Sequence, residues 1–343
     1  MGRGGEPDAD PREGKTVSEV VIVENLKKYF AARTEMAALL SGRPSGVIRA
    51  VDGVSFDMGH GEILGLVGES GSGKSTIARV IARLEEPDSG EIWVDGQRIS
   101  DLKGSGLKRF YRQVQMIFQD PYESLNPRFR VYDTVVEPLK VQKIVPRHRR
   151  GDLVIQALQR AGLKRVEEYL PKFPHQLSGG ERQRLSIARA LVVEPKVLIA
   201  DEPVSMLDVS IKAGILNLLK QLSRVYGVTL LYISHDLSTV KYLCDRVVIM
   251  YLGKFVEMGR AEDVIDQPRH PYARALQAAI PIPDPSHRRP RAAVGDIREG
   301  RSLPLEGCRY RKECPNAMDA CRAIEPAMRP VGEDHLVACH LYD

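Results

Sequence analysis

The segment GESGSGKST (68–76) has residue types and a spacing suited to binding phosphate. It fits the pattern G-x-x-x-x-G-K-[ST], follows the apolar run EILGLV and precedes an amphipathic stretch. Glycines let successive backbone N–H groups turn toward one centre, and a helix N-terminus adds positive partial charge. The pattern therefore predicts a site for phosphate groups. The residues expected to line it are Gly68, Ser70, Gly71, Gly73, Lys74, Ser75 and Thr76.

Lys74 and Ser75 are expected to have different roles in this loop. In the phosphate-loop pattern the lysine reaches the β- and γ-phosphates, and the next hydroxyl ligates Mg²⁺. A chance glycine-rich loop is the alternative, and the strand before it and the helix after it argue against that reading. We therefore expect Lys74 to contact phosphate oxygens and Ser75 to hold a magnesium ion.

Two carboxylates follow a second apolar strand pattern, in VLIADEP (197–203). Asp201 at the end of such a strand could hold Mg²⁺ through its water shell, and Glu202 could orient or deprotonate an attacking water. Acids after strands often cap helices instead. Beside the phosphate loop the capping reading is weak, so Asp201 is assigned to the metal ion and Glu202 to the water.

Alternating strand and helix patterns place these residues in an α/β fold. VLIA (197–200) and TLLYIS (229–234) are short and wholly apolar, as expected for strands buried on both faces of a parallel sheet. Between them, apolar residues at helical spacing from Ile211 to Leu222 predict a helix that ends near Gly227. This alternation is typical of an α/β sheet.

The first part of the chain is predicted to be rich in β-structure. EVVIVENLKKYF (19–30) has the pattern of a strand, and AVDGVSFDMGHGEILGLVG (50–68) that of two short strands joined by a glycine turn. A helix with one buried stripe should follow the phosphate loop. The stripe consists of Ile77, Val80, Ile81 and Leu84. Because Lys74 and Asp201 are too far apart for one crossover, a mostly helical insertion is expected at about 120–190.

Composition divides the chain into three parts. Residues 1–18 are rich in glycine, proline and charge, so they are predicted to be a disordered tail. Residues 19–280 should form the main domain. Several prolines and the basic stretch HRRPR (287–291) then predict an extended connection, so that 281–343 form a small extension with a four-cysteine metal site.

Overall charge and hydropathy exclude some classes of function. Lys and Arg number 50 against 45 Asp and Glu, so the net charge of +5 gives no reason to expect a nucleic-acid partner. No apolar run approaches the roughly 18 residues of a membrane span, and the N-terminal segment lacks the apolar core of a signal peptide. The expectation is a cytoplasmic protein that reaches a membrane only through its partners.

The stretch HQLSGGERQRLSIARALVVEPKVLIADEP (175–203) resembles the ATP-binding subunits of ABC transporters, and LSGGERQR (177–184) resembles their signature motif. The resemblance implies a P-loop nucleotide-binding domain with an N-terminal antiparallel β-subdomain, a helical signature subdomain and here a small cysteine-rich element. It also implies that two such subunits pair head to tail, each signature capping ATP bound to the other phosphate loop. The capping residues would be Ser178, Gly179 and Gly180.

Further positions can be assigned by the same resemblance. Gln119 is similar to the Q-loop glutamine near the γ-phosphate and Mg²⁺, His235 to the switch histidine and Asp208 to the D-loop acid. Tyr29 is similar to the aromatic that stacks on adenine, with Phe30 or a core role as alternatives. The implied catalytic set is Glu202, His235, Gln119 and Lys74, and the implied Mg²⁺ set is Ser75, Gln119 and Asp201. Val204 and Met206 replace the usual Thr and Ala, a departure that bears on subunit pairing.

Two segments indicate a branch of the family. Segments of the dipeptide/oligopeptide importer ATPases are similar to QPRHPYARALQAAIPIPDP (267–285) and DPYESLNPR (120–128) in this chain. In that branch, the segment similar to 120–128 receives a coupling helix from the membrane subunit. The resemblance implies an ATPase subunit at the cytoplasmic face of the cell membrane, partnered by a second ATPase copy or paralogue, two permease subunits and an extracytoplasmic solute-binding protein. Import of oligosaccharides or nickel, or a soluble ABC ATPase outside transport, are the alternatives.

Cys308, Cys314, Cys321 and Cys339 are separated by five, six and seventeen residues. Disulfides are disfavoured in a reducing cytosol, and zinc knuckles usually have two to four intervening residues. Four thiolates suit a [4Fe–4S] cluster. Because the element is short and has few apolar residues, it needs a cross-link or a bound metal to fold. The spacing of the cysteines alone favours neither an iron–sulfur cluster nor zinc over the other. Resemblance to the dipeptide importer subunits favours iron–sulfur. Cys244 is isolated and is expected to be a buried apolar residue.

Overall fold

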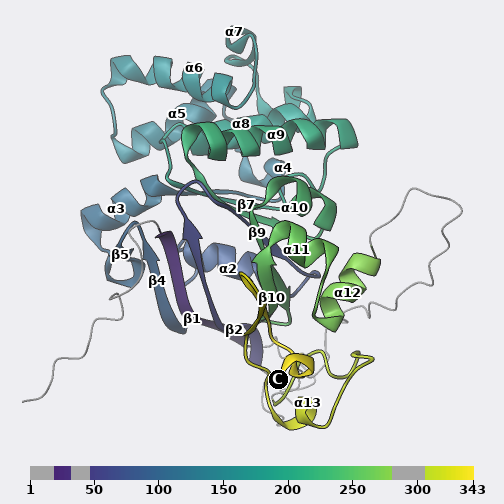
Figure 1. The fold of residues 1–343 in the computed structure, drawn as a ribbon. Coiled ribbons are helices and arrows are strands. Elements are labelled where there is room, and N and C mark those ends of the chain that lie inside the picture. The colour runs from purple at the N-terminus through teal and green to yellow at the C-terminus, as the bar shows by residue number, and fades with distance from the viewer. Residues whose placement is uncertain (1–18, 32–46, 280–305) are drawn as a thin grey trace, which may run out of the picture.

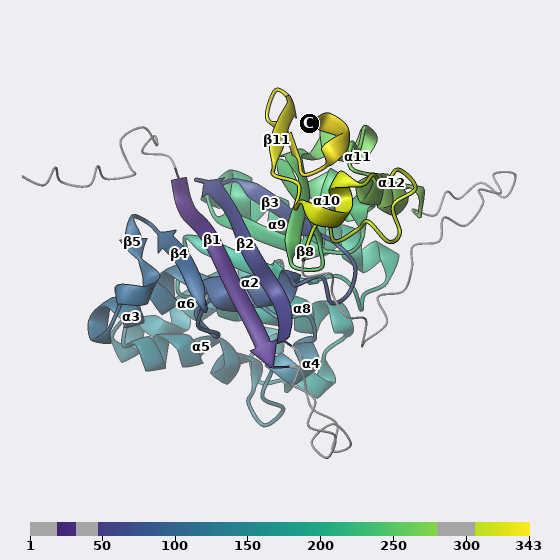
Figure 2. The same ribbon diagram turned by 90° about the horizontal axis from the view of Figure 1, so that it is seen from below.

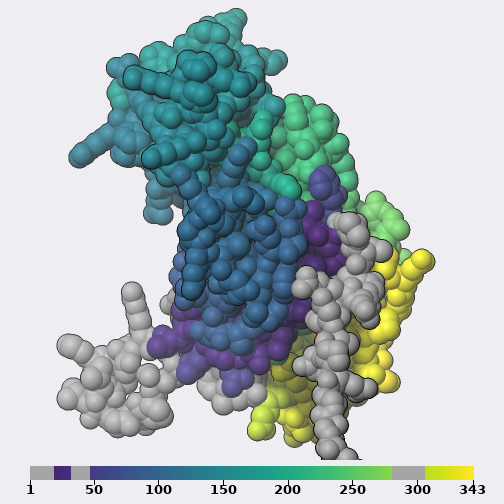
Figure 3. Space-filling view, turned by 90° about the vertical axis from the view of Figure 1, so that its left-hand side faces the viewer, coloured from purple at the N-terminus to yellow at the C-terminus, as the bar shows by residue number. Residues whose placement is uncertain are grey.

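The computed structural model describes residues 19–31, 47–279 and 306–343 (Figure 1). The tail predicted at 1–18 lies outside the described residues. Residues 32–46 and the proline-rich connection with its basic stretch also lie outside them. The main body contains two sheets, a helical region at one end and a C-terminal element at the other (Figures 1 and 3).

A four-stranded antiparallel sheet, in the order β2-β1-β4-β5, forms the N-terminal layer. Its strands are β1 (Glu19–Ala31), β2 (Val47–Gly59), β4 (Ser89–Val94) and β5 (Gln97–Arg98). Apolar residues of β1, including Val21, Val23 and Leu26, are buried against the second sheet and the helix that follows the phosphate loop. The predicted first strand is therefore confirmed.

The second sheet has eight strands in the order β11-β12-β10-β9-β3-β8-β7-β6. Its strands are β3 (Ile63–Val67), β6 (Val114–Ile117), β7 (Val197–Asp201), β8 (Thr229–Ser234), β9 (Arg246–Tyr251), β10 (Lys254–Arg260), β11 (Arg329–Gly332) and β12 (His335–Val337). Strands β6, β7, β8, β3 and β9 are parallel, and every residue of β3, β7 and β8 is buried. This confirms the α/β prediction.

Two details of the predicted β-rich entry were wrong. Strand β2 has 13 residues and belongs to the antiparallel sheet, whereas β3 belongs to the parallel one, so the glycine turn joins two layers. Helix α2 (Lys74–Ile81) ends before Leu84, which is 54% exposed. The left-handed backbone of Arg83 turns the chain out of the helix, so the predicted buried stripe stops at Ile81.

The predicted helical insertion is confirmed. It follows α3 (Gly104–Gln113) and contains α4 (Pro121–Ser124), α5 (Val131–Gln142), α6 (Arg150–Arg160), α7 (Val166–Tyr169) and α8 (Gly179–Leu191). Helices α5, α6 and α8 pack around Val135, Leu158 and Leu185, all fully buried. Helix α9 (Val209–Tyr226) then leads back to β8 and ends at Gly227 as predicted, in a left-handed conformation.

The last part of the chain returns to the parallel sheet. Helix α10 (Leu237–Leu243) packs on β3 and β8, and helices α11 (Ala261–Asp266) and α12 (Pro271–Ala278) pack on β10, while α13 (Ala320–Ala323) lies in the C-terminal element. Strand β12 of that element pairs with β10, so the extension adds two strands to the main sheet. Figures 1 and 2 show the element beside α12, and the Tyr342 hydroxyl donates to the carbonyl oxygen of Arg269 just before that helix at 3.1 Å. Within the described ranges, no helix is long and apolar enough to cross a membrane.

Candidate active site

The phosphate loop is held in a shape that only glycine permits at two positions. Gly73 has φ 111°, and a Cβ there would lie 2.0 Å from the carbonyl oxygen of Ala50. At Gly68 a Cβ would lie 2.2 Å from the carbonyl oxygen of Met250. The loop is thus clamped against neighbouring backbone, while Ser70 and Gly71 are exposed at its tip.

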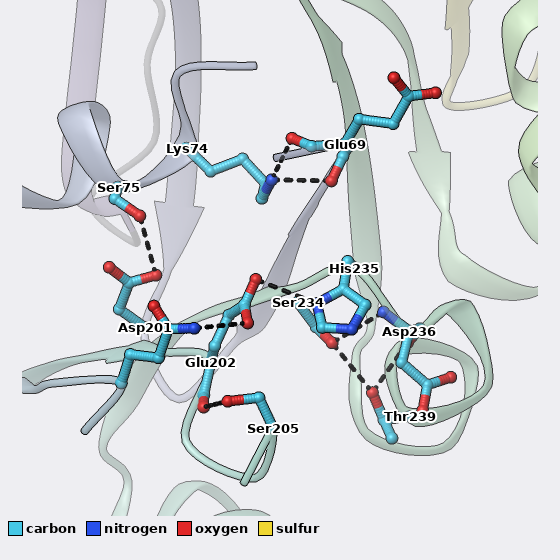
Figure 4. A network of polar contacts seen from close by, with 12 residues as sticks. Glu69, Lys74, Ser75, Asp201, Glu202, Ser205, Ser234, His235, Asp236 and Thr239 are labelled. Carbon is cyan, nitrogen blue, oxygen red and sulfur yellow. Dashed lines mark hydrogen bonds and ion pairs between the residues drawn. The ribbon is translucent and has the colours of Figure 1, made fainter. Parts of the chain in front are cut away.

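Lys74 is buried within this loop and binds the loop itself. Its Nζ donates hydrogen bonds to the carbonyl oxygens of Gly68 and Glu69, both at 2.7 Å (Figure 4). Burial lowers the pKa of Lys74, although the charges of Glu202, Asp201 and Glu69 oppose this. An ammonium group enclosed by backbone carbonyls can exchange them for phosphate oxygens of higher charge.

Ser75 and Asp201 meet where Mg²⁺ was predicted. The Ser75 hydroxyl donates to Oδ1 of Asp201 at 3.2 Å, joining the start of α2 to the end of β7. Burial raises the pKa of Asp201, opposed by this hydrogen bond, and the charge of Glu202 raises it further. A cavity of about 500 Å³ opens beside this pair and is also lined by Gln119. The cavity is thus lined by residues that carry a hydroxyl, a carboxylate and an amide, a donor set that suits Mg²⁺.

Glu202 is the centre of the site (Figure 4). Its Oε2 accepts a hydrogen bond from Nε2 of Gln119 at 3.1 Å, and Nδ1 of His235 lies 3.0 Å from its Oε1. Its backbone is left-handed, with φ 45°, and its N–H donates to the carbonyl oxygen of Ile233 at 3.0 Å. The structure thus brings together three of the four residues predicted to be catalytic, at the carboxyl ends of neighbouring strands.

The signature motif begins α8 in the helical region. Ser178 is the N-cap, and its Oγ accepts from the backbone N–H of Glu181 at 3.3 Å, while Oε2 of Glu181 accepts from the N–H of Ser178 at 2.8 Å. A Cβ at Gly180 would lie 2.6 Å from Cγ2 of Ile211 in α9, whereas one at Gly179 would meet Leu207 at an ordinary 3.6 Å. These contacts involve none of the residues that surround Lys74 and Glu202.

Tyr29 lies on β1 in an unexpected network. Its hydroxyl donates to Oδ1 of Asp52 at 2.6 Å, and the guanidinium of Arg49 lies 5.6 Å from its ring centre. Burial raises the pKa of Asp52, but the hydrogen bond from Tyr29 and the charges of Lys254 and Arg309 outweigh burial, so that the pKa is lowered. Asp52 was not predicted, because an acid within the strand AVDGVSF gives no signal of its partners.

The phosphate loop also has a contact that sequence reasoning missed. The backbone N–H of Glu69 donates to the hydroxyl of Tyr272, in α12, at 3.1 Å. Tyr272 is fully buried beside Tyr251, with ring centres 4.6 Å apart. Helix α12 therefore supports the loop directly.

The four C-terminal cysteines are all free thiols. Burial raises the pKa of Cys308 to about 11, and burial also raises the pKa of Cys314 and Cys339. Within the described part of the chain, no group of three or more His, Cys, Asp or Glu side chains is placed to hold a metal ion. The structure therefore offers no preformed cage for the predicted cluster. Cys244 is buried, as predicted.

Comparison with known proteins decides the family. The family described as ABC transporter matches residues 51–205, and the family described as oligopeptide/dipeptide transporter, C-terminal region, matches residues 256–321. The oligopeptide transport ATP-binding protein AppF of Bacillus subtilis is 41% identical, over 94% of this chain and 97% of AppF. The chain belongs to the ABC transporter family. A Brucella ovis protein, named as an ATP-binding protein for peptide import, is 43% identical to this ABC protein over 94% of its length and 98% of the relative.

Solved ABC structures share the fold. The ATP-binding cassette MJ0796, in a dimeric post-hydrolysis state bound to ADP and Pi, is 28% identical with a TM-score of 0.61, over 70% of this chain and 98% of the cassette. CbiO1 from Clostridium perfringens is 29% identical, also with a TM-score of 0.61, over 73% of this chain and 92% of cbiO1. Two residues of this ABC protein, Val204 and Met206, stand where the family usually has Thr and Ala. Val204 is buried, whereas Met206 is 64% exposed. Only Met206 is therefore available to a partner.

Proposed function

We propose that this chain is the ATP-hydrolysing subunit of an importer of dipeptides, oligopeptides or related solutes. The observation that carries the proposal is the meeting of Glu202 with Gln119 and His235 beside the phosphate loop. The match of residues 256–321 to the oligopeptide/dipeptide transporter C-terminal region supports peptides as the solute. Import of oligosaccharides or nickel, and a role outside transport, are not favoured by these similarities.

The residues of the chain have distinct tasks in hydrolysis. The loop N–H groups and Lys74 bind the β- and γ-phosphates of ATP, with Tyr29 against the adenine. Ser75, Asp201 and Gln119 would hold Mg²⁺, which neutralises developing charge on the phosphates when bound. The carboxylate of Glu202 accepts a proton from the attacking water.

Gln119 and His235 orient that carboxylate. Each is within hydrogen-bond distance of one Glu202 oxygen, so the carboxylate is fixed before substrate arrives. His235 has a side chain 61% exposed, whereas that of Glu202 is 17% exposed. The imidazole can therefore turn toward a γ-phosphate without a change in the core.

Two surfaces of this chain would contact other subunits of the proposed importer. Ser178 bonds to Glu181, and Gly179 and Gly180 face Leu207 and Ile211 rather than the phosphate loop of their own chain. This supports their action on ATP held by a second ATPase subunit. The segment 120–128 would receive a permease at the cytoplasmic face of the membrane. Two permease subunits and a solute-binding protein complete the proposed importer.

Uptake of labelled peptides tests this function. We expect cells of the source organism that lack this chain to lose uptake of one class of di- or oligopeptide, and the wild-type chain to restore it. A chain with Glu202→Gln should not restore it, because transport needs hydrolysis. Unchanged uptake, together with ATP hydrolysis stimulated by ribosomes or DNA, would place the protein outside transport.

The metal prediction for the four cysteines remains a proposal. Four free thiols in one small element suit a [4Fe–4S] cluster in kind, and zinc is the alternative, but the thiols do not form a cage in this structure. No step of the mechanism above uses such a group. We expect anaerobically purified protein to contain about four irons and four acid-labile sulfides per chain. Zinc alone, or no metal, would contradict iron–sulfur and leave the ATPase proposal unchanged.

A further inference from the structure

The run HPY (270–272) begins α12, and contacts fix its backbone on the main sheet. His270 is the N-cap, and its Nδ1 accepts the N–H of Tyr272 at 3.0 Å. The N–H of His270 donates to Oε2 of Glu257 on β10 at 2.7 Å. Pro271 follows at the first helical position, where an N–H would have no partner within the helix. Tyr272 therefore extends from a backbone that is anchored on β10.

The side chain of Tyr272 is 1% exposed and packs against two other tyrosine rings. Its ring centre is 4.6 Å from that of Tyr251 on β9 and 5.4 Å from that of Tyr310 in the C-terminal element. Because a close-packed interior leaves such a ring little room to turn, the place of its hydroxyl is set by the fold.

That hydroxyl contacts the peptide group that joins Gly68 and Glu69. It accepts the N–H of Glu69 at 3.1 Å, and the carbonyl oxygen of the same peptide group accepts Nζ of Lys74 at 2.7 Å. The carbonyl oxygen of Glu69 accepts this ammonium group as well (Figure 4). A trans peptide group is planar, so its N–H and C=O point in opposite directions and turn together. A hydrogen bond that fixes the N–H on Tyr272 therefore also fixes the carbonyl that holds Lys74.

We propose that Tyr272 is a positioning residue for Lys74, acting through the peptide group between Gly68 and Glu69, so that α12 fixes the phosphate loop before ATP binds. The inference rests on the proposed function, because it takes Lys74 as the residue that reaches the β- and γ-phosphates. Without the hydroxyl, the N–H of Glu69 loses this acceptor and the peptide group is free to turn. One of the two carbonyls that hold the ammonium group is then lost, and ordering Lys74 on the phosphates costs part of the binding free energy.

Acylation of lysine amines tests the contact without any nucleotide. The full-length chain is treated with acetic anhydride, and the rate of reaction at each lysine is read by mass spectrometry. Tyr272→Phe keeps the ring and removes the hydroxyl. In this variant we expect Lys74 to react about fivefold faster than in the wild type, the size of effect that one lost hydrogen bond produces. Lys196 is the internal reference, since it is exposed and should react at an unchanged rate.

Ligand titrations on the same proteins test the consequence for binding. Tyr272→Phe should weaken the binding of ATP and of inorganic tripolyphosphate by the same factor, about fivefold, because the contact acts on the phosphates and not on the base. Tyr251→Phe is the matched control, because it removes a hydroxyl of the same ring cluster that donates to Glu313 at 2.5 Å. It should leave both affinities and the reactivity of Lys74 unchanged.

The outcomes separate positioning from a general loss of structure. Unchanged reactivity of Lys74 in Tyr272→Phe, unchanged ATP affinity, or a loss confined to ATP would each overturn the proposal. Equal effects of Tyr272→Phe and Tyr251→Phe would overturn it too, because they would show that the ring cluster acts only on stability. If the wild-type chain binds neither ATP nor tripolyphosphate, the proposed function fails instead, and the acylation rates still decide whether Tyr272 positions Lys74.

Discussion

Replacing Glu202 by Gln should lower the turnover number for ATP hydrolysis by about 10²–10⁴-fold, the usual contribution of a positioned general base. Gln has the shape of Glu, so the hydrogen bond from Gln119 can be kept by the amide oxygen. What is lost is the ability to accept a proton from water. The affinity for ATP should therefore stay near the wild-type value, because Lys74 and the loop that bind the phosphates are unchanged.

Phosphate release and nucleotide binding measured on the same samples check this result. Glu123→Gln is the matched control, since Glu123 is an exposed acid that lines the same cavity and contacts none of the three central residues in the described network. It should retain wild-type turnover. Turnover in Glu202→Gln within a few-fold of wild type would mean that another group activates the water. A large loss of ATP affinity would mean that Glu202 holds the loop instead.

Much of this centre was predictable because it is built from local patterns and one rule of topology. The phosphate loop and Asp201 each follow an apolar strand, and parallel strands present their carboxyl ends at one edge of the sheet. Strands β3, β7 and β8 are neighbours in that sheet, so residues after each of them had to meet. The N-cap pair of Ser178 and Glu181 was also readable from the S-x-x-E spacing, although the prediction did not include it.

Contacts made by buried charges at long sequence separation were not predictable. Nothing in the sequence near Asp52 indicates that its partner is Arg309, because an ion pair has no periodicity. The docking of β12 on β10 was missed for a related reason. β12 has three residues, too few to give a strand pattern, and it is ordered by its neighbour rather than by its own propensity.

The same docking explains the largest loss of stability that we expect, from Glu257→Ala. Glu257 lies on β10 with no exposed area. Its carboxylate accepts the backbone N–H groups of Arg269 and His270, at 2.8 and 2.7 Å, and lies 2.7 Å from Nε2 of His335 on β12. Burial raises the pKa of Glu257, and these three groups oppose it. Removing the carboxylate leaves two buried groups and one partly buried N–H without this partner, so the free energy of unfolding should fall by about 3–5 kcal/mol.

Denaturant unfolding and limited proteolysis check this prediction, with Glu262→Ala as the control, an exposed glutamate on the adjoining α11. The control should change stability by less than about 0.5 kcal/mol. Burial lowers the pKa of His270 to about 3, so His270 is neutral and its Nδ1 already accepts from the N–H of Tyr272. It cannot replace the lost carboxylate. A Glu257→Ala protein as stable as the control would mean that water fills the site, and that strand pairing alone holds the C-terminal element on the ATPase domain.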